Sequence, residues 1–402
     1  MGRAGAVDWT NERNDGIQSM SRELSIALIG QQFMGRAHSN AMGQVNRFFD
    51  LKREVVKQIA CGRDAGELRN FAARWGWNRS TTNWQEAVCD EHVDLVDIAT
   101  PNALHAEIAL EALAAGKHVA CEKPLANSLE EAGRMRDAAR AAKRQKTFVW
   151  FNYRRCPAVA FARQLIAEKR LGRLLHVRAT YLQDWGGPQT ERSWRFQKKF
   201  AGSGAHGDLN AHLVDLARFL TGESVVEVQG AVAKTFYPMR PLPGNPGKKG
   251  RSDVDDAFAF TASLSKGAVC TFEASRVAGP HQNANTIEVN GEAGSLRFSF
   301  EEMNLLHFYD AADGHREGGW RRIMCTSAND HPYAENWWPD AHLLGYEHSF
   351  TNMLADIVRS LSGQEPAVPL PDFNDAYETQ RVLEAALIAA ETRKAVQLSE
   401  VG

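Results

Sequence analysis

Residues 24–35 read LSIALIGQQFMG, a short apolar run that passes directly into a glycine turn. An apolar run of this length bounded by glycine is typical of a buried strand. Residues 36–49 behind it have the composition of a helix, and residues 55–61 form a second aliphatic run. The start of the chain therefore predicts a strand, a helix and a strand in succession.

The same alternation continues to residue 150. The expected helices are 67–75, 103–115 and 129–143, and the expected strands are 93–99, 118–121 and 147–151. Thr100 can cap the helix near 103, and Pro101 suits its first position. Strands that alternate with helices of about 10–15 residues favour a parallel, doubly wound sheet. We therefore predict an α/β chain whose N-terminal part, residues 24–150, is a Rossmann domain.

The turn at residues 30–35 lies where a dinucleotide-binding fingerprint is expected. That fingerprint has glycine at its first, third and sixth positions, so that the backbone can approach a pyrophosphate at a helix N-terminus. Gly30 and Gly35 fit, but Gln32 stands at the third position. The motif is incomplete, and an ordinary strand-to-helix turn is the alternative.

Arg63 and Asp64, which follow the second strand, bear on the choice of cofactor. Asp64 is far from Gly30 in sequence for the usual acidic partner of the adenosine ribose. Arg63 beside it could stack on adenine or meet a 2′-phosphate. We favour NAD, with NADP as the open alternative.

From residue 151 the pattern changes to longer strands. The expected strands are 174–183, 225–236, 256–264, 268–275, 286–290 and 295–300, and the expected helices are 158–168, 207–220, 347–361 and 373–396. A tight turn at 265–267 joins two of the strands, and the series suggests consecutive antiparallel hairpins. We predict a C-terminal α+β domain over residues 151–402 with a large, mainly antiparallel open sheet. Residues 238–253, rich in proline and glycine, are expected to be a mobile loop that covers a neighbouring site, or else a plain surface excursion.

Two features of this layout carry possible chemistry. Lys123 follows the strand at 118–121 and would lie at the carboxyl end of the sheet, where open α/β sheets bind ligands. Asp208, His212 and Asp215 recur at helical spacing on one face of the helix at 207–220. A surface Lys-Pro turn and a hydrogen-bonded, half-buried histidine are the structural alternatives.

Composition narrows the possible partners and the compartment. Lys plus Arg number 47 against 49 Asp plus Glu, so a nucleic-acid partner is not expected. The six cysteines include no CxxC pair, which fits reduced buried thiols in the cytoplasm better than a disulfide framework or a metal site. No apolar run approaches the roughly 18 residues of a membrane span. Residues 1–23 lack the apolar core of a secretory signal and are expected to be a disordered arm.

Five motifs follow one another along the chain. They are LIG (28–30) with FMGRAHSNA (33–41), TPN (100–102) with His105, EKP (122–124), NYR (152–154) and GDLNAHLVD (207–215). In this order they resemble the Gfo/Idh/MocA family of sugar and inositol dehydrogenases, which also includes glucose-fructose oxidoreductase. The resemblance covers nearly the whole chain from residue 24, and Gln32 is its departure from the family pattern.

The resemblance implies that Lys123, Asp208 and His212 are catalytic. Oxidising a secondary alcohol requires a base that removes the hydroxyl proton while hydride leaves carbon, and histidine suits this task. Lys123 can donate to the same oxygen, and Asp208 can orient either partner. Whether Lys123 or His212 takes the proton stays open.

The resemblance also implies two sets of binding residues. The expected cofactor-binding residues are Gly30, Gln32, Phe33, Met34, Gly35, Ser39, Arg63, Asp64, Thr100, Asn102, His105, Glu122 and Lys123. The expected substrate-binding residues are Asn152, Arg154, Gln183, Asp184, Trp185, Trp194 and His342. The tryptophans are chosen because flat aromatic faces suit the apolar face of a sugar ring, although core or interface packing would also explain them.

The similarity extends to members that act on pyranosides, including levoglucosan dehydrogenases and glycoside 3-oxidases. It implies an NAD-dependent oxidation of a sugar ring hydroxyl, at C3 of a glucoside, to give a keto sugar. Inositol or trans-dihydrodiol dehydrogenase activity is one alternative, and a ligand sensor without turnover is an alternative of another class. The cofactor could be held tightly and reoxidised by a second sugar. The resemblance further implies a homo-oligomer formed through the open sheet face.

Overall fold

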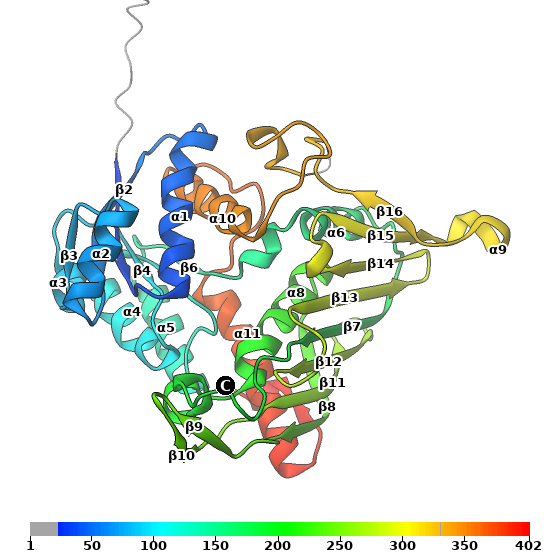
Figure 1. Cartoon of the computed structure of the whole chain (residues 1–402). Helices are drawn as coiled ribbons and strands as arrows, with labels where there is room; N and C mark the ends of the chain where they lie inside the picture. Colours follow the sequence, from blue (N-terminus) through cyan, green and yellow to red (C-terminus); the bar gives the residue numbers. More distant parts are fainter. Residues whose placement is uncertain (1–22, 330) are drawn as a thin grey trace, which may run out of the picture.

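The computed structural model describes residues 23–329 and 331–402. Two sheets organise them, one in each part of the chain (Figure 1). The arm expected at residues 1–23 lies outside the described residues except for Glu23.

The first sheet is parallel, with six strands in the order β3-β2-β1-β4-β5-β6. The strands are β1 (Leu24–Ile29), β2 (Val55–Cys61), β3 (Arg79–Thr81), β4 (Leu95–Ile98), β5 (His118–Cys121) and β6 (Thr147–Val149). The helices are α1 (Phe33–Phe48), α2 (Ala65–Trp75), α3 (Trp84–Cys89), α4 (His105–Ala114) and α5 (Leu129–Ala141). This confirms the predicted doubly wound domain, in which only β3 and α3 were not expected. The strand order reverses between β1 and β4, where folds of this kind bind ligands.

The glycine turn after β1 is shaped by close backbone contacts. Gly30 has φ +127°, and a Cβ there would come within 2.3 Å of the Ala99 carbonyl oxygen. A Cβ at Gly35 would come within 2.1 Å of the Gly30 carbonyl oxygen. Both positions therefore require glycine, and together they let α1 start directly behind the strand.

The second sheet is mixed, with nine strands in the order β16-β15-β14-β13-β7-β12-β11-β8-β17. The strands are β7 (Leu174–Leu182), β8 (Val225–Lys234), β11 (Ala257–Leu264), β12 (Val269–Ser275), β13 (Ala284–Gly291), β14 (Gly294–Ser299), β15 (Leu305–Asp310), β16 (Arg321–Met324) and β17 (Val396–Gln397). It is mainly antiparallel, as predicted, but β12 and β7 pair in parallel. The expected run of consecutive hairpins is therefore wrong at the centre, because β7 lies between the consecutive strands β12 and β13 and pairs with both.

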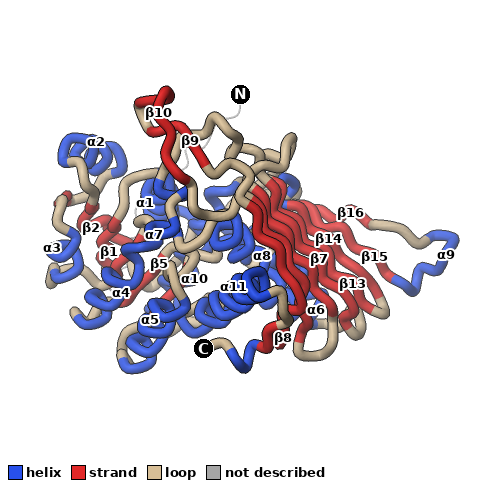
Figure 2. Tube along the Cα trace, turned by 90° about the horizontal axis from the view of Figure 1, so that it is seen from below, coloured by secondary structure: helices blue, strands red, loops and turns tan. Residues whose placement is uncertain are grey.

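The helices of this part lie on one face of the large sheet (Figure 2). They are α6 (Pro157–Ala167), α8 (Ala211–Thr221) and α11 (Phe373–Thr392), while α7 (Lys198–Ala201) and α9 (Gly314–Glu317) are single turns. The expected helix at 207–220 begins as a π-helical turn, His206–Asn210, before α8. The helix expected to reach residue 396 ends at Thr392, because Arg393 turns left-handed and the chain joins β17. The other late helix, α10 (Tyr346–Leu361), packs against α1.

The segment expected as a loop at 238–253 contains a hairpin of β9 (Met239–Leu242) and β10 (Asn245–Arg251). The left-handed Gly244 makes the tight turn possible. Arg240 within it is fully buried and donates to Asp256 at 2.6 Å. A long-range ion pair therefore fixes a segment whose composition suggests a loop.

Among residues 23–329 and 331–402, no helix combines the length and apolar character needed to cross a bilayer. Nor does this part of the chain contain a group of three or more His, Cys, Asp or Glu side chains arranged to hold a metal ion.

Candidate active site

The carboxyl end of β5 and the π-helical turn before α8 meet at a cavity of about 280 Å³. Lys123 follows β5, and its Nζ donates to both the carbonyl oxygen and the Oδ1 of Asp208, each at 2.8 Å. His212 lies in the first turn of α8 and lines the same cavity. The structure thus brings together the three residues that the sequence proposes as catalytic, from two domains.

Asp208 and His212 have opposite electrostatic surroundings. Burial favours a raised pKa for Asp208, but Lys123 and Arg276 outweigh it and lower that pKa well below its ordinary value. Burial lowers the pKa of His212 well below its ordinary value, and the charge of Lys123 lowers it further. The pair therefore consists of a carboxylate and a neutral imidazole at neutral pH.

His212 is held by packing rather than by hydrogen bonds. Its ring stacks on Tyr153 with centroids 4.4 Å apart and planes 21° apart. Within the described residues, neither ring nitrogen has a protein hydrogen-bond partner. The imidazole is thus 6% exposed, fixed in orientation and open to the cavity.

A second hollow of about 390 Å³ runs from this cavity along the carboxyl ends of β1, β2 and β4. Seven predicted cofactor residues line it: Gly30, Gln32, Phe33, Met34, Arg63, Asp64 and Thr100. Phe33, Met34 and Thr100 also line the first cavity, together with the predicted Asn102, Glu122 and Lys123. The two hollows are therefore continuous, which suits a dinucleotide in one and a substrate in the other.

The groove has the features that a dinucleotide requires. The first amides of α1 have no side-chain cap, since Gln32 at the N-cap makes none, and they are available to a phosphate. The Thr100 hydroxyl is buried there without a partner. Gln32 itself is exposed, so the side chain that breaks the fingerprint lies outside the close backbone contacts. These residues fit NAD.

Three predicted cofactor residues lie behind the groove wall. Gly35 supports the turn, Ser39 accepts a hydrogen bond from Trp77 at 3.1 Å, and His105 bonds the carbonyl oxygens of Thr100 and Pro124. They shape the groove without lining it.

The predicted substrate residues divide into two groups. Asn152, Gln183, Trp185 and Trp194 line the cavity. Arg154 does not, because its buried guanidinium pairs with Asp215 at 2.9 Å and with Asp375. Asp184 and His342 are exposed and also lie outside the lining. Asp215, which shares a helical face with His212 in sequence, is therefore part of an internal ion pair.

Other lining residues were not predicted from the sequence. They are Tyr153, Tyr181, Arg195, Leu209 and Tyr346. Tyr153 lies inside the NYR motif and Arg195 follows Trp194. Their position next to predicted residues could therefore have indicated that they line the cavity. Nothing local marks Tyr181 or Tyr346.

A chain of polar groups forms one wall of the cavity. The Tyr153 and Tyr181 hydroxyls lie 2.9 Å apart, and the Tyr181 hydroxyl donates to Asn283 at 2.8 Å. Gln183 donates to the same oxygen of Asn283 at 2.9 Å and accepts from Trp185 at 2.6 Å. The wall presents pre-arranged hydroxyl and amide groups to a polyhydroxylated ligand.

A buried triad supports the strand end that carries Lys123. His38 lies between Asp97, at 2.8 Å, and Glu122, at 3.0 Å. Burial would lower the pKa of His38, but the two carboxylates outweigh it and raise that pKa to about 9. Trp150 donates to the other oxygen of Asp97 at 2.8 Å. Glu122 is thus fixed from behind by an imidazolium.

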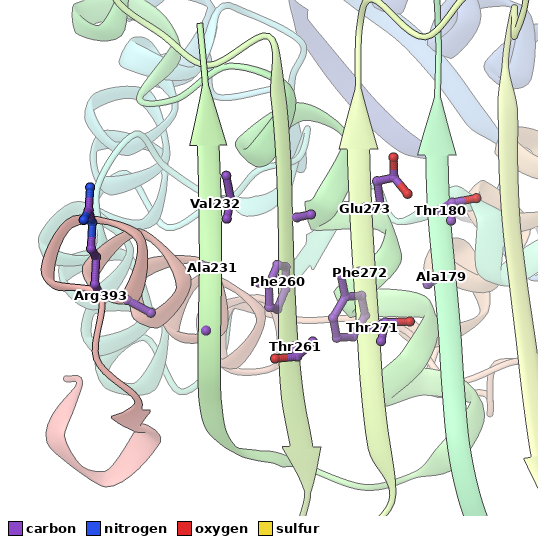
Figure 3. A pocket seen from close by; sticks show the side chains of 13 residues that line it. Ala179, Thr180, Ala231, Val232, Phe260, Thr261, Thr271, Phe272, Glu273 and Arg393 are labelled. Atoms are coloured by element: carbon purple, nitrogen blue, oxygen red, sulfur yellow. The ribbon is translucent and has the colours of Figure 1, made fainter.

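A third hollow, of about 610 Å³, lies on the large sheet away from both others. Figure 3 shows Val232, Thr261, Thr271, Glu273 and Thr180 around it, on β8, β11, β12 and β7. It is shallow, its lining mixes small side chains with Phe260, Phe272 and Arg393, and it includes none of the catalytic candidates.

Comparison with known proteins agrees with this geometry. Residues 24–152 match the model of the oxidoreductase family with an NAD-binding Rossmann fold, and residues 159–297 match the GFO/IDH/MocA C-terminal domain. Levoglucosan dehydrogenase of Pseudarthrobacter phenanthrenivorans is 38% identical over 94% of this chain and 99% of its own. Glucose-6-phosphate 3-dehydrogenase of Bacillus subtilis is 28% identical over 89% of this chain and 94% of its own.

Solved structures are similar over the same extent. An oxidoreductase domain protein from Kribbella flavida has a TM-score of 0.89 and 46% identity, covering 94% of this chain and 99% of its own. Levoglucosan dehydrogenase in complex with NADH and levoglucosan has a TM-score of 0.88 and 38% identity, with the same coverage. The predicted fold, NAD-binding domain and enzyme class are thereby confirmed. The chain belongs to the Gfo/Idh/MocA family of NAD-binding oxidoreductases.

Proposed function

We propose that this protein oxidises a ring hydroxyl, at C3, of an uncharged glucose-like sugar or glycoside, with NAD as acceptor. The observation that carries the proposal is the neutral, unbonded His212 beside the Lys123–Asp208 pair, in a cavity continuous with the dinucleotide groove.

In this proposal His212 is the base. Its neutral imidazole takes the hydroxyl proton, while the ammonium of Lys123 donates a hydrogen bond to the oxygen on which charge develops. Asp208 holds Lys123 in place, because its carbonyl oxygen and its Oδ1 both accept hydrogen bonds from Lys123. NAD, bound by the Gly30 turn and the start of α1, supplies the acceptor for the hydride.

The cavity supports a small neutral sugar. About 280 Å³ holds a monosaccharide ring rather than a long glycan. Its charged lining residues balance, with Lys123 and Arg195 against Glu122 and Asp208. Trp185 and Trp194 offer flat faces for the apolar side of a ring. Of the described residues that line the cavity, the two cations are already engaged, because Lys123 pairs with Asp208 and Arg195 stacks on Trp194, so neither is free for a 6-phosphate.

C3 is proposed because both named relatives act on glucose-like rings and one is a 3-dehydrogenase by name. The test is a substrate panel of glucose, methyl glucosides, levoglucosan, glucose 6-phosphate, myo-inositol and an aromatic trans-dihydrodiol. Purified protein and NAD should form NADH and a 3-keto product from the neutral glucosides, with a lower kcat/KM for glucose 6-phosphate. Oxidation of only inositol or the dihydrodiol would overturn the glucoside proposal. Binding of sugar without NADH formation would point to a sensor.

Reduced nicotinamide absorbance in the protein as purified would show a tightly held cofactor. A second sugar that restores the oxidised form would then extend the proposal to a two-sugar cycle.

We further propose that a second copy of the chain covers the helix-free face of the large sheet. Thr261 and Glu273 are exposed on this face, and Val232 is 59% exposed (Figure 3). Ala259 is also exposed, and it pairs with Val232 on one side and with Glu273 on the other. Small and β-branched side chains on a broad sheet suit packing against an identical surface. Ala259→Arg should convert an oligomer to monomers in light-scattering measurements, and a wild-type monomer would refute the proposal.

A reducing compartment, the cytoplasm, fits the buried thiols of Cys61, Cys121, Cys156 and Cys270. Location by cell fractionation tests this.

A further inference from the structure

Arg276, in the segment that leaves β12, is a buried cation beside the catalytic candidates. It is 1% exposed. Its guanidinium donates to Oδ2 of Asp208 at 2.9 Å and to the carbonyl oxygen of Arg195 at 3.1 Å. It also lies 5.2 Å from the ring centroid of Trp185, a cavity wall residue. One buried side chain therefore contacts the candidate site, the neighbouring loop and the aromatic wall.

The two oxygens of Asp208 are divided between two cations. Oδ1 accepts from Lys123 and Oδ2 accepts from Arg276. If Asp208 paired with Lys123 alone, the two charges would cancel. With Arg276 sharing the carboxylate, the group of three keeps a net positive charge where an alkoxide would develop.

We propose that Arg276 is a positioning residue for the oxidation: it divides the charge of Asp208, so that Lys123 keeps electrostatic attraction for the substrate oxygen. This inference rests on the proposed function. It adds to that function a residue outside the cavity lining that sets the electrostatics of the site.

Several charged and aromatic groups face His212, the group whose titration would report the change. His212, whose protonation would report the change, faces Lys123 after β5, Asp208 in the π-helical turn, Tyr153 and Phe151 before α6, and Tyr181 on β7. Arg195 adds a further positive charge near Asp208. Removing the charge of Arg276 makes the site less positive, so the protonated form of His212 becomes easier to form.

Arg240 provides a matched control. Like Arg276 it is buried, is ion-paired to an aspartate and lies over Phe196, with its guanidinium 3.8 Å from the ring centroid. It also donates to the carbonyl of Gly186 beside Trp185. The side chain of its aspartate, Asp256, does not line the cavity, and Asp256 contacts Arg276 through the backbone, where its carbonyl oxygen accepts from the Arg276 N–H at 2.9 Å. Arg240 therefore supports the same loop without touching Asp208.

The experiment compares R276M, R276K, R240M and K123M, using NAD and the best glycoside of the panel. R276M should lower kcat by about tenfold or more and change KM by less than about threefold. The acid limb of its kcat/KM profile should move to higher pH by about 1 pH unit. R276K, which keeps the charge, should retain the wild-type acid limb. R240M should lower the melting temperature and leave the acid limb in place.

The outcomes separate the two proposals. If K123M keeps turnover, the proposed catalytic set is wrong. A different outcome is that K123M loses turnover while R276M keeps the wild-type acid limb or shifts it no more than R240M does. In that case the inference about Arg276 is wrong and the proposed catalytic set is not contradicted. Should R276M fail to fold, R276Q removes the charge while keeping a polar side chain, and the same expectations apply to it.

Discussion

His38 and His212 are both buried histidines with carboxylate neighbours, yet their surroundings drive their pKa values in opposite directions. His38 bonds both ring nitrogens to carboxylates, and its pKa rises to about 9. Among the described residues, neither ring nitrogen of His212 has a hydrogen-bond partner. Burial and then the ammonium of Lys123 lower the pKa of His212 well below the ordinary value. The difference teaches that a buried histidine stays charged when carboxylates contact it directly, by charge and by hydrogen bond, and becomes neutral when burial and a nearby ammonium outweigh a more distant carboxylate. One histidine supports structure as an imidazolium, and the other is a neutral imidazole that lines the cavity, as the proposed base requires.

The largest expected effect is on turnover by His212→Ala. Loss of a general base costs about 10²- to 10⁴-fold in kcat. His38→Asn should reduce kcat far less, because His38 acts on Glu122 rather than on the substrate. Steady-state kinetics with NAD and the panel substrate measures both. Equal losses in the two variants would break the distinction between a catalytic and a structural histidine.

A smaller effect is expected on stability as a function of pH. The folded pKa of His38, about 9, lies above its unfolded value of 6.5. The stabilisation is therefore complete below pH 6.5 and is lost as pH rises toward 9, by about 3 kcal/mol at most.

His212 has the opposite effect on the dependence of stability on pH, and it acts on the acid flank of the stability curve. Its folded pKa is lowered, so unfolded protein binds the proton more readily and stability is lost as pH falls below 6.5. Urea unfolding from pH 5 to 9 of wild type, His38→Asn and His212→Ala measures both flanks. His38→Asn should flatten the alkaline flank and His212→Ala should reduce the acid one, to which His105, His206 and His331 also contribute. An unchanged alkaline flank in His38→Asn would contradict the charged triad.

The fold was predictable where one short segment determines it. The run LSIALI is buried at every position, and Gly30 and Gly35 meet backbone at distances that no side chain permits. In contrast, β3 has only three residues, none of them apolar, and so gave no hydrophobic signal. The β9–β10 hairpin depends on the contact of Arg240 with Asp256, which no local pattern reveals.

The site was predictable to a similar degree. Lys123, Asp208 and His212 stand in motifs whose order marks the family, and the fold brings them together. Arg276 and Tyr181 belong to no motif, and only the folded chain places them. Arg154 lies away from the cavity because Asp215 and Asp375 engage it, a pairing across three separate segments. Motifs therefore indicate the candidate catalytic groups, whereas their electrostatic support comes from tertiary contacts.

A further expected effect concerns the acid limb of activity. Because His212 is neutral well below pH 6.5, kcat/KM should stay level as pH falls through 6.5 and decline only at lower pH. If half of kcat/KM is lost near pH 6.5, His212 titrates like an ordinary histidine. Burial and Lys123 then do not lower its pKa as the contacts indicate. The pH profiles are measured in buffers of constant ionic strength, because salt screens exposed charges far more than the buried pair of His212 and Lys123.

The smallest expected effect tests how His212 is held. Tyr153 stacks on His212 and shares a hydrogen bond with Tyr181, so Tyr153→Phe removes the hydrogen bond and keeps the ring. Loss of one such bond costs about 1 kcal/mol, or a several-fold rise in KM, because the polar wall loses a hydroxyl group that a sugar can contact. The acid limb of kcat/KM should not move, since the ring that orients His212 remains. Tyr153→Leu removes the stack as well, and it should lower kcat in addition to raising KM. If Tyr153→Phe and Tyr153→Leu lower kcat equally, the hydroxyl rather than the stacked ring positions the imidazole, and His212 depends on hydrogen bonding after all, as His38 does.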